Sequence, residues 1–238
     1  MNLKLLHILT VTFMSFFVYQ IAFASQDDAV DIIQTIQVDA ISLNSTAADI
    51  ESFIKTSSPL ECKRVDVPER KSKIPSRPSK PRHQSWNCSY THQTLSELLN
   101  IQMSDGVITY LYHSTAYDNA QDFEKIKLYI RGVHKKLESA GLTSDQTNSK
   151  NFMTYTENDG KGASAPSFSQ HLKAKRAVLC DGLPVTFLVS VNANAVPSQN
   201  IYKAGIKMER SHQQLHCENI NTDEKALDDA WNTHSKPK

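Results

Sequence analysis

Two Asp-Gly pairs constrain the fold of this 238-residue chain most strongly. They occupy positions 105–106 and 181–182, and each lies between stretches rich in strand-forming residues. Asp-Gly readily adopts the positive φ angles that a two-residue type I′ turn requires. Each pair therefore predicts an antiparallel β-hairpin.

The residues around the second pair alternate as a half-buried strand does. In 183–191 the apolar side chains fall on odd positions, namely Leu183, Val185, Phe187, Val189 and Val191. In 201–210 they fall on even positions, with Tyr202, Ala204, Ile206 and Met208 in one phase. A period of two indicates strands with one buried face. We expect strands at 172–180, 183–191 and 201–210, and a shorter one at 151–156.

Helices are indicated at four places. In 118–141 an apolar stripe recurs every three or four residues, and Gly141 is placed to end the helix. Residues 44–46 form a helix N-cap pattern, with Ser57-Ser58-Pro59 as the stop. We expect shorter helices at the start of 27–43, followed by an extended stretch, and after residue 222.

These elements indicate an α+β fold of antiparallel β-meanders with packing helices, held by disulfides. We expect two sheets, each with its own helix, in a first half at 25–117 and a second half at 118–238. Both halves show helix, strands and an Asp-Gly hairpin in similar order. Two alternatives stay open: two tandem α+β units, or one continuous domain.

The four cysteines are Cys62, Cys88, Cys180 and Cys217. An even number in an exported chain indicates two disulfides, and three pairings are possible. We favour Cys62–Cys88 and Cys180–Cys217, because each pair closes a loop within its own half. Each should contribute on the order of 3 kcal/mol through chain entropy. A zinc site formed by all four is disfavoured, because no C-x-x-C spacing occurs.

The N-terminus has the features of a secretory signal peptide at 1–24. Lys4 supplies a positive charge, an apolar stretch follows from 5 to 21, and Ala22-Phe23-Ala24 forms a small-x-small cleavage site. We expect cleavage after Ala24 and a periplasmic or secreted protein with no transmembrane segment left. The alternative is an uncleaved anchor, since 5–23 is nearly long enough to span a bilayer.

A basic, proline-rich segment is the main anomaly of composition. Residues 63–82 contain Pro68, Pro75, Pro78 and Pro81 and eight basic side chains: Lys63, Arg64, Arg70, Lys71, Lys73, Arg77, Lys80 and Arg82. Because prolines at this density oppose helix and sheet, we expect an exposed loop. Its charge suits an acidic protein or an anionic envelope surface as partner. The alternative is a loop whose charge serves only solubility.

The sequence contains few candidate catalytic or metal-binding residues. His212 and His216 are four apart and form the one candidate metal pair, but the H-E-x-x-H glutamate is missing. His113, His134 and His171 are candidates for acid–base chemistry by residue type alone. No nucleophile elbow, P-loop or dinucleotide fingerprint occurs, so we expect no cofactor. Nucleic acid is not expected, because the net charge is +1 and the basic loop lacks aromatic residues.

These observations predict a non-enzymatic binding or interaction protein, exported to the periplasm or beyond the cell. The alternative is a secreted hydrolase with a histidine-based site that uses a metal. The basic loop supports the first hypothesis, and the His212/His216 pair supports the second.

Overall fold

The computed structural model of the chain describes residues 27–56, 60–69, 82–92, 95–117, 120–144, 149–160, 167–211 and 217–234. The signal peptide expected at 1–24 lies outside these residues. Among the described helices, none combines the length and the apolar character needed to cross a membrane.

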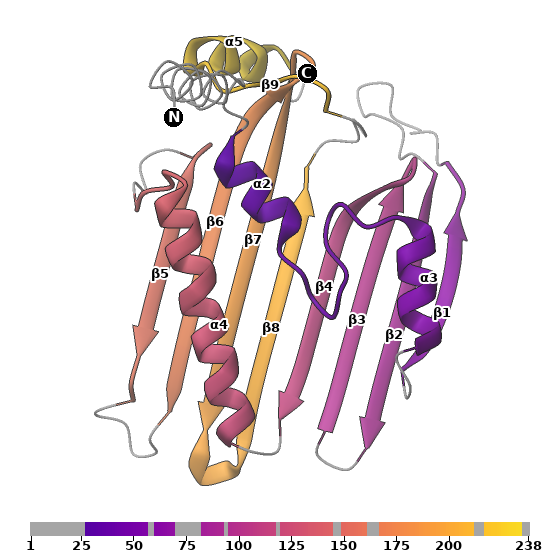
Figure 1. Ribbon diagram of the computed structural model, residues 1–238, viewed down its shortest axis with the longest axis vertical. Coiled ribbons are helices and arrows are strands. Elements are labelled where there is room, and N and C mark those ends of the chain that lie inside the picture. Colours follow the sequence, from indigo (N-terminus) through magenta and orange to yellow (C-terminus); the bar gives the residue numbers. More distant parts are fainter. Residues whose placement is uncertain are drawn as a thin grey trace, which may run out of the picture.

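One antiparallel sheet forms the centre of the molecule (Figure 1). Its strands are β1 (Glu61–Val67), β2 (His83–His92), β3 (Leu95–Ser104), β4 (Val107–Tyr117), β5 (Phe152–Asn158), β6 (Phe168–Cys180), β7 (Leu183–Val196), β8 (Ile201–Arg210) and β9 (Ile220–Asn221). They lie in the order β1-β2-β3-β4-β8-β7-β6-β5, and β9 pairs with the end of β6. An antiparallel α+β fold is therefore confirmed.

Both Asp-Gly hairpins are present. Asp105 and Gly106 join β3 to β4 with φ angles of 47° and 85°. Asp181 and Gly182 join β6 to β7 with φ angles of 49° and 80°. All four residues have the positive φ of a type I′ turn, as the sequence predicted.

The two halves share one sheet, so the expectation of two sheets is wrong. β4 pairs with β8 over eight residue pairs, with Tyr112 opposite Lys207 and Ser114 opposite Gly205. As separate sheets, both halves would expose an unpaired strand edge at this position, and pairing β4 with β8 removes both edges. Each half still contributes a helix followed by four strands in sequence. A true repeat of two units stays a prediction.

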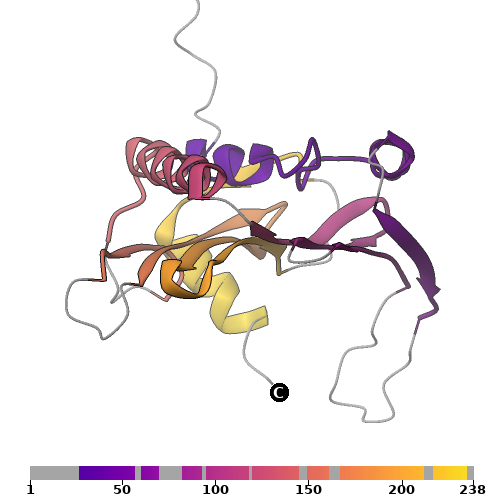
Figure 2. The same ribbon diagram turned by 90° about the horizontal axis from the view of Figure 1, so that it is seen from below.

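The helices are α2 (Asp28–Thr35), α3 (Ala47–Thr56), α4 (Ala120–Ser139) and α5 (Glu224–His234), with a short 3-10 turn, η1, at Pro197–Gln199. Figure 2 shows α2, α3 and α4 on one face of the sheet and α5 on the other. The large core lies between the sheet and the first three helices. On the opposite face α5 packs on one end of β6 and β7, and its Leu227 is buried against Ala177 and Leu179 of β6.

The long helix α4 follows the stripe seen in the sequence. Phe123, Ile130, Val133 and Leu137 are buried against the sheet. At its end the amide of Leu142 donates to the Leu137 carbonyl over 3.1 Å, while Gly141 has φ 88°. This is the Schellman arrangement, which the Gly141-Leu142 pair predicted.

Asp27 fixes α2 on the sheet. One of its carboxylate oxygens accepts the amide of Val30 and caps the helix. The other accepts two N–H groups of Arg176 from β6, each over 2.7 Å. The side chain of Asp27 is only 7% exposed, so this charge-assisted pair forms in a largely dry environment and positions α2 over β6.

A tight turn follows α2. Val38 and Ile41 exchange two backbone hydrogen bonds of 2.8 Å, and both side chains are buried. The residues between them, Asp39 and Ala40, have φ angles of 48° and 71°. The turn fills part of the space between α2 and α3 (Figure 1). The turn places Asp39 over β4, a strand that is distant from Asp39 in the sequence.

The disulfides join Cys62 to Cys88 and Cys180 to Cys217, the two pairings favoured from the sequence. Cys62 and Cys88 lie directly opposite each other on β1 and β2. Cys217 brings the segment before β9 to the end of β6. Each bond therefore joins neighbouring parts of the same sheet.

The basic loop is shorter than expected. Residues 63–67 belong to β1 and pair with 83–87 of β2, so the expectation of a loop over the whole of 63–82 is wrong. None of the four prolines precedes position 68, and nothing in 63–67 opposes strand pairing. Residues 70–81 lie outside the described part of the chain.

Candidate functional site

The face of the sheet opposite α2, α3 and α4 is polar. Side chains directly opposite each other in antiparallel strands share a face. One rung runs Gln102, Tyr110, Glu209, Leu188, Lys175, Phe152 across β3, β4, β8, β7, β6 and β5. Since α5 covers only one end of β6 and β7, no helix among the described residues covers most of this polar face.

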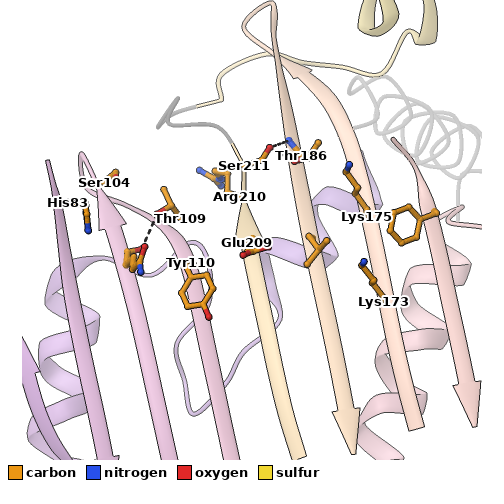
Figure 3. Close-up of a pocket in the computed structure, with 13 residues that line it drawn as sticks. His83, Ser104, Thr109, Tyr110, Lys173, Lys175, Thr186, Glu209, Arg210 and Ser211 are labelled. Carbon is orange, nitrogen blue, oxygen red and sulfur yellow. Dashed lines mark hydrogen bonds between the residues drawn. The ribbon is translucent and has the colours of Figure 1, made fainter. Parts of the chain in front are cut away.

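A cavity of about 680 Å³ opens on this face beside α5. The residues around it come from seven strands and the residue after β8: His83, Gln102, Ser104, Thr109, Tyr110, Phe152, Lys173, Lys175, Thr186, Leu188, Glu209, Arg210 and Ser211. Figure 3 shows these residues on neighbouring strands, with Tyr110, Glu209, Lys173 and Lys175 among those drawn around the cavity. The volume suits a ligand of small-molecule size or a segment of a larger partner.

Two lysines line the cavity, and a buried arginine lies at its edge. Lys173 and Lys175 are two residues apart on β6 and therefore share this face. Arg210, the last residue of β8, follows the lining residue Glu209, but it is opposite Phe187, so its side chain lies on the helix-covered face. Among the described residues no carboxylate forms an ion pair with any of them. The one acidic lining residue, Glu209, pairs with Lys207 over 2.8 Å. The cavity therefore carries an excess of positive charge.

Aromatic rings position both lysines. The Lys173 ammonium lies 5.6 Å from the ring centre of Phe152, and the Lys175 ammonium lies 5.4 Å from that of Trp231. Lys175 also donates to the Ser149 carbonyl over 3.0 Å. Burial, and then the charge of Lys173, lowers the pKa of Lys175. An anion bound beside Lys175 would offset both effects.

Arg210 is an unusual residue because it is a buried cation. It is 8% exposed, and its guanidinium carbon lies 5.0 Å from the ring centre of Phe187. Its Nε atom is buried and has no hydrogen-bond partner among the described residues. Burial lowers the pKa of Arg210. A buried guanidinium N–H without an acceptor is costly. Because Arg210 packs on Phe187 on the helix-covered face, this cost belongs to the core and not to the cavity.

Hydroxyl groups complete the lining. Ser104 and Thr186 are buried, and Thr186 and Ser211 are in hydrogen-bond contact through their hydroxyls. Thr109 sits at a register shift between β3 and β4 and donates to the Gln102 carbonyl over 3.4 Å. Burial raises the pKa of Tyr110, which keeps its phenol a neutral donor. Lysine and hydroxyl donors together match phosphate, sulfate or carboxylate oxygens.

A second cluster lies on the helix-covered face. Nε2 of His113, on β4, is 2.9 Å from a carboxylate oxygen of Glu97 on β3 and 3.2 Å from one of Asp39 in the turn after α2. Among the residues described, these three form the one group of histidine, cysteine or acidic side chains arranged to hold a metal ion. Of the three, sequence reasoning singled out His113 alone, and as an acid–base candidate.

The structure describes some of the expected site residues and not others. His212 and His216, the candidate metal pair, lie outside the described residues, as do Arg70, Lys71, Lys73, Arg77 and Lys80 of the basic segment. Arg64 lies in β1, where its guanidinium pairs with Glu51 of α3 over 2.5 Å and lies 5.4 Å from the Trp86 ring centre. It thus packs α3 onto the sheet. Arg82 immediately precedes β2.

The ends of the basic segment lie near the cavity. The segment leaves β1 after Val67 and enters β2 at His83, and these two residues are directly opposite each other. His83 also lines the cavity. The residues that flank the undescribed part of the segment therefore lie at the edge of the cavity.

Sequence reasoning missed Lys173, Lys175 and Arg210. A signal for the lysines was present: in 169–175 the odd positions are Ser, His, Lys and Lys, so one strand face is polar and becomes basic. No local signal marks Arg210, because its burial arises from packing against Phe187 on another strand.

Comparisons with known proteins add no identification. No family model, no curated protein and no solved structure matches this chain. The function must therefore be argued from the site itself.

Proposed function

We propose that this chain is an exported binding protein that captures a polyanionic ligand on the open face of its sheet. The ligand class is a molecule or partner segment that carries several phosphate, sulfate or carboxylate groups. The observation that carries the proposal is the pair Lys173 and Lys175, which line one cavity from the same face of β6 and form no ion pair with a carboxylate among the described residues.

Charge and geometry support this ligand class. Lys173 and Lys175 project from the same face of β6 and line one space, so they offer two positive groups to one ligand. Each hydrogen bond to a charged group contributes about 1.5–3 kcal/mol. A ligand with one anionic group would leave the other lysine unmatched, which favours a polyanion.

The basic segment supports a larger partner. The segment enters β2 at His83, which lines the cavity, and its sequence is basic, so an acidic protein or an anionic envelope surface is the partner that would suit both regions. Export is supported by the signal-like N-terminus and is compatible with two disulfides. The hydrolase alternative rests on His212 and His216, outside the described residues, and the described geometry favours the binding protein.

The test is a calorimetric titration of the oxidised mature protein with inorganic tripolyphosphate and with a heparin-derived hexasaccharide. Wild type should bind at least one of them at low salt. The double variant K173M/K175M should bind at least tenfold more weakly, since about 1.4 kcal/mol corresponds to a factor of ten.

Lys203→Met is the matched control. Lys203 is exposed on β8, on the same face, opposite Asn194 and Ala116, and it does not line the cavity. The K203M substitution removes one charge from the same surface and should change the affinity for either probe by less than twofold. If K203M weakens binding as much as the cavity variants do, attraction is diffuse and the cavity is not the site. If wild type binds neither probe, the proposal fails.

The contribution of the basic segment needs a separate variant. Because β1 extends to Val67, a deletion must spare 63–67, and residues 70–81 should be replaced by a short Gly-Ser linker. If this linker variant loses hexasaccharide binding but still binds tripolyphosphate, the segment forms the larger part of the partner-binding surface.

A further inference from the structure

From Asp39, Glu97 and His113 we infer a binding site for a single divalent cation of the zinc type, on the helix-covered face of the sheet. The site is separate from the basic cavity. It involves neither His212 nor His216, and it does not depend on the proposed function.

The three donor atoms converge from distant parts of the chain. Glu97 and His113 lie on paired strands, with His113 opposite Leu99, so their side chains are diagonal neighbours on one face. Asp39 comes from the tight turn between buried Val38 and Ile41. All three donor atoms lie within 4.8 Å of one another. The backbone that carries them is thus fixed by sheet pairing and by a hydrogen-bonded turn.

The separations fit one small cation. A tetrahedral zinc with bonds of about 2.0–2.2 Å has ligand atoms about 3.4 Å apart. The His113 nitrogen lies 2.9 Å from Glu97 and 3.2 Å from Asp39. Side-chain shifts of a few tenths of an ångström would open the cluster to the size of the ion. Imidazole nitrogen with two carboxylate oxygens suits zinc better than magnesium or calcium, which prefer oxygen alone.

A single N–H group on His113 satisfies the surrounding oxygen atoms poorly. Both carboxylates approach the same ring nitrogen, Nε2, and the Thr115 hydroxyl lies 3.3 Å from it as well. One ring nitrogen carries at most one hydrogen, so it cannot donate fully to two carboxylates. The carboxylates of Asp39 and Glu97, whose oxygens lie within 4.8 Å of each other, also repel each other. A divalent cation would satisfy both carboxylates and accept the nitrogen lone pair.

The site has room for a further ligand. A cavity of about 170 Å³ adjoins the cluster and is lined by Asp39 and His113 and, among others, Thr115, Tyr117 and Tyr129. The Tyr129 phenol donates to the Gln37 carbonyl over 3.2 Å, which holds the turn that carries Asp39. Three protein ligands beside an open space resemble zinc sites that keep one coordination position for water or another small ligand.

The experiment is titration of the chelator-treated, oxidised mature protein with ZnCl₂, followed by calorimetry and native mass spectrometry. One zinc per chain should bind, and the melting temperature should rise with zinc concentration. Asp39→Asn is the sharpest variant, because asparagine tolerates positive φ as aspartate does and only the charge is lost. Removal of a direct ligand should weaken binding at least about tenfold, the lower limit seen for outer-shell changes.

Two further variants and one control complete the test. Glu97→Gln and His113→Gln should each weaken zinc binding in the same way. His171→Ala removes an exposed histidine on the opposite face and should leave zinc binding unchanged. CoCl₂ gives an independent readout, since the visible spectrum of bound Co²⁺ should change in D39N.

Two outcomes would overturn the inference. If the folded wild type takes up no zinc, the cluster binds a proton only. If zinc binds but D39N, E97Q and H113Q bind it with wild-type affinity, the metal sits elsewhere, with His212 and His216 the next residues to substitute. Circular dichroism on each variant shows whether loss of zinc binding reflects loss of the fold.

Discussion

Arg210 and Phe187 lie directly opposite each other on β8 and β7, and the guanidinium carbon of Arg210 is 5.0 Å from the Phe187 ring centre. The ring supplies favourable electrostatics to a cation that has lost most of its water. It does not supply a hydrogen-bond acceptor to Nε. The side chain of Arg210 therefore lies with the core on the helix-covered face, whereas its neighbour Glu209 faces the cavity.

Replacing Arg210 by methionine should leave both the fold and tripolyphosphate binding intact, because the Arg210 side chain lies on the face opposite the cavity. Methionine retains an unbranched side chain over Phe187 and removes a buried charge, so the free energy of unfolding should change by no more than about 1 kcal/mol. Urea unfolding and calorimetry on the same sample measure both effects. A loss of affinity in R210M would show that the guanidinium contributes to the anion site.

Anion binding should depend on pH through Lys175. Burial, and secondarily Lys173, lowers the pKa of Lys175, so this lysine loses its proton at a lower pH than an ordinary lysine does. A bound anion stabilises the charged form, and affinity should therefore fall as pH rises through this lowered pKa. Titrations at increasing pH test this dependence. In K175M the fall should begin only at higher pH, and an unchanged profile would contradict the assignment.

The lowered pKa of Lys175 also predicts that the stability of the ligand-free protein depends on pH. Because the pKa of Lys175 is lower in the folded than in the unfolded state, its charge disfavours folding below that pKa. The free energy of unfolding should therefore rise with pH between the folded and the unfolded pKa of this lysine. This contribution should vanish in K175M, as measured by urea unfolding at several pH values, and persist in the K203M control.

Removing the Cys62–Cys88 disulfide should destabilise the protein without changing the cavity. The two cysteines are 26 residues apart, so the bond restricts a loop of the unfolded chain and contributes about 3 kcal/mol. The double variant C62A/C88A should show this loss in urea unfolding while still binding tripolyphosphate. An equal loss of affinity would mean that β1 and β2 shape the cavity directly.

Ala40→Gly should stabilise the turn after α2. Ala40 has φ 71°, a conformation that glycine adopts without the steric cost of a Cβ. We expect a gain of about 0.5–1 kcal/mol in the free energy of unfolding. Because the change spares Asp39, zinc affinity should stay the same or rise. A loss of stability in A40G would show that the methyl group of Ala40 packs favourably.

Cleavage of the N-terminal segment has a direct test. Protein recovered without reductant from the envelope or the medium of its source should begin at Ser25, and its mass should lie four hydrogens below that of the reduced chain. Intact mass spectrometry measures both values. A chain that retains residues 1–24 would instead support the uncleaved anchor.

The sequence by itself determined the local elements. The Asp-Gly pairs at 105–106 and 181–182 set both hairpins, the apolar stripe of 120–139 set α4, and the cysteine spacing favoured the observed disulfides. Turn geometry, helix periodicity and capping each depend on residues within a few positions of one another. Such preferences can be read from one segment at a time.

Only the tertiary structure decided the pairing of β4 with β8, the burial of Arg210 and the meeting of Asp39, Glu97 and His113. The three residues of that cluster are spread over 75 positions, from 39 to 113. Their approach depends on which strand edges pair and which loop crosses the sheet. The summed packing of the whole chain sets those choices, and no single segment contains them.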